Sequence, residues 1–149
     1  MDQERKKDLS IFYWLTDLFI DSPFINIKDG FPVENLVLPT IAVETKSINL
    51  DPFELGNKNQ KFLRSWYIEI FATTKSQRDE YSYKILRALQ DSIPVNDYDE
   101  GFPPDVEPTQ IGYLLPEDIR MDIIKVMPQL VSKLYYRATI SFIALYSEI

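Results

Sequence analysis

Apolar side chains recur at helical spacing near the start of the chain. They are Leu9, Phe12, Leu15, Leu18 and Phe19. Separations of three and four residues place such side chains on one face of an α-helix. Pro23 ends the pattern because proline has no backbone N–H to donate. The sequence therefore predicts an amphipathic helix over residues 3–21, followed by a polar segment with room for a short strand at 24–28.

Two long alternating segments follow. Residues 36–50 carry β-branched side chains at alternating positions, which predicts a long strand. Pro39 cannot donate to a sheet ladder, so this strand is expected to lie at an edge or to begin irregularly there. Residues 62–73 predict a second strand, with Trp66, Ile68, Ile70 and Ala72 on one face and Tyr67, Glu69 and Phe71 on the other. The connection 51–61 is long for a hairpin, and long loops are often functional.

The second half of the chain predicts one helix and two more strands. Thr74 or Ser76 can cap a helix that Pro94 ends. Its apolar stripe is expected to be Tyr83, Leu86, Leu89 and Ile93, with Ile85 beside it. Residues 96–116 are rich in proline and acids, so we expect a loop ordered largely against a partner. Alternation then predicts strands over 119–127 and 134–146.

This order of elements predicts the fold class. It indicates an α+β domain spanning residues 1–149, with a mainly antiparallel sheet, two helices packed on one face and long inter-strand loops. No segment approaches the roughly 20 apolar residues that cross a bilayer. The N-terminal apolar run is interrupted by Asp17 and lacks a small-residue cleavage site, so we expect neither a secretory signal nor a membrane contact.

Composition narrows the possible chemistry. The chain has no histidine and no cysteine, which excludes Ser-His-Asp catalysis, cysteine nucleophiles, thiolate metal sites and disulfides. Its 16 Lys and Arg against 23 Asp and Glu give a net charge of −7. Such a charge disfavours nucleic-acid binding, which depends on neutralising phosphates. Carboxylate chemistry, a hydroxyl or lysine site, or no catalysis at all remains.

Carboxylates offer the main enzymatic alternative. The loop 97–107 contains Asp97, Asp99, Glu100, Asp105 and Glu107, whose oxygens suit Ca²⁺ or Mg²⁺. However, Gly101 comes one position early for an EF-hand, and Pro108 stands where its glutamate belongs, so a solvated acidic loop is favoured. A glycosidase-like pair could be drawn from Glu44, Glu54 and Glu69. For Glu69 the simpler expectation is a single charge on the solvated face of its strand.

Loops also carry basic and aromatic side chains. Lys58, Lys61 and Arg64 lie close to Phe62 and Trp66, but three cations are weak support for a nucleic-acid patch. Aromatic residues stand beside prolines in predicted loops: Phe31, Phe53 and Phe102. A monomer seldom exposes such side chains, so they favour assembly, with local packing under the loops as an equal alternative.

Three segments carry a resemblance to a known family. They are residues 64–71 (RSWYIEIF), the predicted helix 78–90 and residues 93–98 (IPVNDY). Together they resemble the tail-terminator or tail-completion neck proteins of tailed bacteriophages, and the similarity of layout spans residues 3–146. The resemblance implies a homohexameric ring that caps the tail tube, stops its polymerisation and faces the head connector. The acidic, proline-rich loop departs from the family layout.

We therefore predict a non-enzymatic virion protein with no catalytic, cofactor or metal site. Its partners would be copies of itself, the tail tube protein and the head connector, first in the host cytoplasm and then in the virion. Six copies at −7 each would carry −42, and an acidic lumen lets DNA pass without binding. The expected interface residues are Phe53, Leu55, Lys58, Phe102, Tyr113 and Leu114. Alternatives are a head-completion adaptor or other neck protein, a metal-dependent carboxylate enzyme using loop 97–107, and a cytosolic adaptor for peptides.

Overall fold

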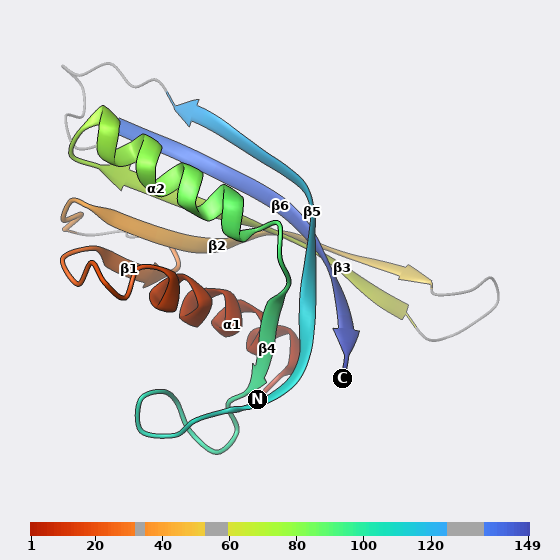
Figure 1. The fold of residues 1–149 in the computed structure, drawn as a ribbon. Coiled ribbons are helices and arrows are strands. Elements are labelled where there is room, and N and C mark those ends of the chain that lie inside the picture. Colours follow the sequence, from red (N-terminus) through yellow and green to blue (C-terminus); the bar gives the residue numbers. More distant parts are fainter. Residues whose placement is uncertain (32–34, 53–59, 125–135) are drawn as a thin grey trace.

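A single six-stranded sheet with two helices on one face forms the described part of the protein (Figure 1). The computed structural model describes residues 1–31, 35–52, 60–124 and 136–149, and for residues 50–52 and 60–62 it describes the backbone alone. The elements are α1 (Gln3–Leu18), β1 (Asn26–Asp29), β2 (Thr40–Pro52), β3 (Gln60–Ala72), α2 (Lys75–Ala88), β4 (Ile93–Asp97), β5 (Thr109–Ile124) and β6 (Tyr136–Glu148). This arrangement confirms the predicted fold class.

The sheet has the order β1-β2-β3-β6-β5-β4. Strand β1 runs parallel to β2, and all other neighbours are antiparallel. Strand β2 begins directly after Pro39, whose peptide bond with Leu38 is cis. Because β1 flanks β2, Pro39 marks an irregular strand start rather than a sheet edge.

Helix α1 begins and ends close to its predicted bounds. The Asp2 side chain caps it by accepting a hydrogen bond from the Glu4 backbone N–H at 2.8 Å. Its buried apolar side chains are Leu9, Ile11 and Leu15, followed by the buried Phe19 directly after its last turn. Phe12, predicted on the buried stripe, is only half-buried.

The core lies between the helices and the sheet. Trp66, Ile68 and Ile70 of β3 and Ile140 and Phe142 of β6 are buried there. Helix α2 adds Tyr81 and Ile85, with Leu89 just beyond its last turn. Thr74 caps α2 through the Gln77 N–H, as predicted. The predicted stripe was wrong at Tyr83, which is 48% exposed because it lies on the side of α2 away from the sheet.

The largest correction concerns residues 96–116, predicted as a loop. Strand β4 extends to Asp97 and β5 begins at Thr109, so only residues 98–108 connect them. Pro116 lies inside β5, where β4 no longer pairs with it. A proline is tolerated there because its missing N–H need not serve a second ladder.

The last two strands were predicted with shifted bounds. Strand β5 starts ten residues before the predicted 119, and β6 covers Tyr136–Glu148 where 134–146 was expected. The ends of those predictions at 125–127 and 134–135 lie outside the described residues. Neither described helix is long and apolar enough to cross a bilayer.

Candidate assembly interface

The three predicted interface residues that the structure describes do not form one surface. Phe53, Leu55 and Lys58 lie outside the described residues. Leu114 was assigned wrongly, because its side chain is fully buried in the core. Tyr113, its neighbour on the opposite face of β5, is half-buried. Phe102 is 45% exposed, with its ring stacked 6.0 Å from that of Tyr98.

A two-stranded arm projects from the sheet instead. Strands β2 and β3 stay paired as far as Pro52 and Gln60, but β1 leaves β2 at Val43 and β6 pairs with β3 only from Arg64 onward. Figure 1 shows the hairpin extending away from the helices. Strand β2 exposes four consecutive side chains where it approaches the arm: Lys46, Ser47, Ile48 and Asn49. The arm could not be predicted from the sequence. Alternating apolar and polar residues indicate how long a strand is, but not where the neighbouring strands cease to pair with it.

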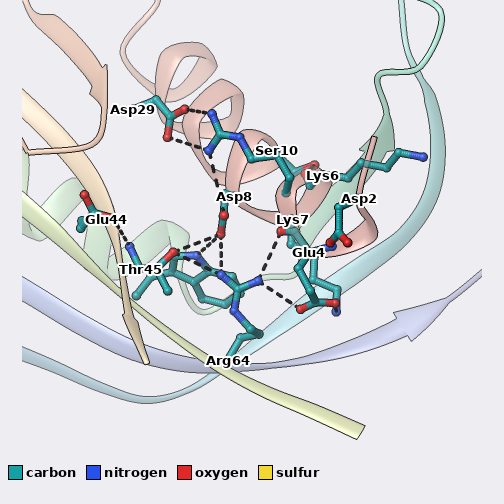
Figure 2. A network of polar contacts seen from close by, with 12 residues as sticks. Asp2, Glu4, Lys6, Lys7, Asp8, Ser10, Asp29, Glu44, Thr45 and Arg64 are labelled. Atoms are coloured by element: carbon teal, nitrogen blue, oxygen red, sulfur yellow. Dashed lines mark hydrogen bonds and ion pairs between the residues drawn. The ribbon is translucent and has the colours of Figure 1, made fainter. Parts of the chain in front are cut away.

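Arg64 fixes the base of the arm to helix α1 (Figure 2). Its guanidinium donates to the Glu4 carboxylate at 3.0 Å and to Asp8 Oδ1 at 2.7 Å. The same Asp8 oxygen accepts from Trp66 Nε1 at 2.8 Å. With only 1% of its surface exposed, Arg64 is part of the interior and not of a surface basic patch. Arg5 pairs with Asp29, which ties α1 to β1.

Lys6 of α1 is a second buried cation, and it pairs with two carboxylates at the start of the acidic loop. Lys6 Nζ lies 3.0 Å from Asp97 Oδ1 and 2.9 Å from Asp99 Oδ2. These two carboxylates raise the pKa of Lys6. The Met1 amino group, at 2.8 Å, and Lys6 together lower the pKa of Asp99 to about 2. Two of the five carboxylates considered as metal ligands, Asp97 and Asp99, are therefore neutralised by the protein's own cations.

This cluster predicts an acid-sensitive contribution to stability. The pKa of Asp99 is about 2 in the folded chain, against about 3.9 in an unfolded one. Its contribution is complete above the unfolded value and is lost as pH falls toward the folded one. Between about pH 5 and pH 2 the melting temperature of the parent should fall further than that of Asp99→Asn. Thermal melts across this range measure it, with exposed Asp91→Asn as control, and parallel curves for parent and Asp99→Asn would contradict it.

Glu69 is also paired, contrary to the expected solvated charge. Its Oε2 accepts from Arg137 Nε at 3.1 Å and from Thr139 Oγ1 at 2.8 Å, and its side chain is buried. The Arg137 guanidinium lies over the rings of Phe31 and Phe71. The cross-strand neighbours on β6 cover this carboxylate, which a single strand's alternation could not reveal. Phe31 remains 43% exposed although it contacts Phe71, so local packing covers only part of it.

A groove of about 600 Å³ lies beside the acidic loop. Its walls include Tyr13 of α1, Asn96 of β4, Tyr98, and Pro103 and Pro104 of the loop. The sequence had suggested the loop's aromatic and proline content but not the contribution of Tyr13. The Asn96 N–H donates to Ser10 Oγ at 3.0 Å, so helix α1 satisfies part of the outer edge of β4.

No family model matches this chain, and no curated protein sequence matches it significantly. Function must therefore be argued from its own geometry. Within the described ranges, no three acidic side chains lie close enough together to hold a metal ion. Glu44 is exposed, and Glu69 is engaged by Arg137. Glu54 lies outside the described residues.

Proposed function

We propose that this chain is a structural protein of a tailed-bacteriophage virion. It forms a homo-oligomeric ring at the head–tail junction, where it ends the tail tube and joins it to the head connector. The nearest alternative is a head-completion adaptor or another neck protein.

The projecting β2–β3 arm is the observation that carries this proposal. A two-stranded ribbon is marginal in water without a sheet or helix to cover it. This one continues past both of its neighbours over Asn49–Pro52 and Gln60–Leu63, and Ile48 at its base is 47% exposed. A ribbon with no neighbouring strand on either side suits contact with a second subunit. The resemblance of residues 64–71 and 93–98 to neck proteins supplies the class of assembly.

Charge supports the same proposal. A formal charge of −7 per chain gives a ring an acidic surface, and such a lumen does not retain DNA phosphates. The metal-dependent enzyme is less favoured because Lys6 already occupies the space between Asp97 and Asp99. A peptide adaptor would use the same exposed surfaces but has no need to close into a ring.

Mass photometry of the purified chain over a concentration series tests the proposal. We expect a species of about six chains, the number that the resemblance to neck proteins implies. Each chain contributes 17.5 kDa, so this species separates clearly from monomer or dimer. A monomer at every concentration would count against the ring, and a dimer that never grows would favour the adaptor.

A further inference from the structure

We propose that neighbouring copies join edge to edge, with the outer edge of β2 in the arm of one copy pairing with the outer edge of β5 in the next. This inference rests on the proposed ring and names its subunit contact. The two edges are called here the arm edge (residues 44–52 of β2) and the β5 edge (residues 115–124).

Both edges lack a neighbouring strand within the described residues. Strand β1 pairs with β2 only from Thr40 to Val43, which leaves the arm edge open. Strand β4 pairs with β5 only as far as Leu114, which leaves the β5 edge open. An unpaired strand presents rows of N–H and C=O groups that another strand can complete.

The directions of the two edges are complementary. Three successive antiparallel pairings lead from β2 through β3 and β6 to β5, so β2 and β5 run in opposite directions. A second copy in the same orientation therefore offers its β2 antiparallel to β5 of the first. Figure 1 shows these strands running in opposite directions across the sheet.

The positions of the two edges are complementary as well. Each open edge is the C-terminal part of its strand, so the two lie at opposite ends and on opposite sides of the sheet. A copy shifted along the strand direction lays its arm edge on the β5 edge, while its β1 and the first copy's β4 stay clear. One contact of this kind uses a different surface on each partner and so propagates to a ring or a filament.

Both edges contain a regular stretch of strand that begins after a shift in register. The ladders of β2 with β3 and β5 with β6 shift register at Thr45/Ser47 and Glu117/Arg120. Beyond these shifts, regular pairing resumes over Ser47–Pro52 and Arg120–Ile124, two segments of similar length. Each segment exposes an isoleucine: Ile48 is 47% exposed and Ile123 is 43% exposed.

Lysine substitution at these isoleucines tests the contact. Ile48→Lys and Ile123→Lys should each abolish the ring species in mass photometry while leaving the melting temperature of the monomer unchanged, since both side chains are largely exposed. Ile20→Lys is the matched control, because Ile20 is 68% exposed in the turn after α1, away from both edges. Rings that survive both edge variants would overturn the contact.

Cross-linking gives an independent test, since the chain contains no cysteine. Asn49→Cys and Asp122→Cys are placed on two separately tagged proteins, mixed and treated with a short bismaleimide. We expect cross-links between the two tags and none when Asp122→Cys is replaced by Thr109→Cys, which lies where β4 covers β5. Rings without these cross-links would overturn the contact and leave the proposed ring standing. Failure of the parent to form rings would overturn the ring and the contact together.

Discussion

Arg64→Met should lower the free energy of unfolding by about 3 kcal/mol, because removing one member of a buried ion pair leaves its partners uncompensated. Among the described residues, Arg64 at the base of the arm is the one that forms ion pairs with both Glu4 and Asp8 of α1. Its guanidinium also lies 4.7 Å from the centre of the Trp66 ring. Methionine keeps the volume of the side chain and loses these three contacts. Urea unfolding monitored by tryptophan fluorescence measures the loss.

An exposed ion pair on the same sheet is the matched control. Arg120 pairs with Asp122 at 3.2 Å, but 75% of its side chain is exposed. Arg120→Met should therefore cost at most about 0.5 kcal/mol. The double variant Asp8→Asn with Arg64→Met should be less unstable than the sum of the two single variants. Equal losses from Arg64→Met and Arg120→Met would contradict the buried role of Arg64.

Leu114→Ala should also cost about 3 kcal/mol of unfolding free energy, because it opens a cavity in a closely packed core. Leu114 is fully buried and pairs across the sheet with Tyr146 and Ile93. If Leu114 instead lay at a subunit contact, its truncation would weaken assembly and spare the monomer. Chemical unfolding of dilute monomer separates these outcomes.

The adjacent residue supplies the control for this substitution. Leu115 points to the opposite face of β5 and is 42% exposed. Leu115→Ala should cost well under half as much as Leu114→Ala, since most hydrophobic stabilisation comes from area removed from water. A reversal of this order would show that the assigned faces of β5 are wrong.

Elements with a clear period could be predicted from the sequence. Both helices, the core face of β3 and the capping of α2 by Thr74 follow from local spacing and local hydrogen bonds. Strand β5 was largely missed because its first part contains Gly112 and Pro116 and follows a proline-rich connection. It forms there because β4 and β6 both pair with it, a tertiary effect that outweighs local preference.

The candidate interface was harder to predict than the fold. Aromatic residues in loops indicated exposure correctly for Phe102, but an alternating pattern cannot tell which face is the core without knowing the neighbouring strands. This is why Leu114 was placed at the surface and Glu69 in solvent. The open edges of β2 and β5 depend on where β1 and β4 end, and no residue type marks those points in the sequence.

Negative-stain electron microscopy of the assembled species shows whether the chain closes into a ring. We expect class averages of closed rings with a central hole wide enough for a DNA duplex, and loss of these rings in Ile48→Lys. Open filaments, compact particles without a hole, or an absence of assemblies would contradict a ring through which the genome passes.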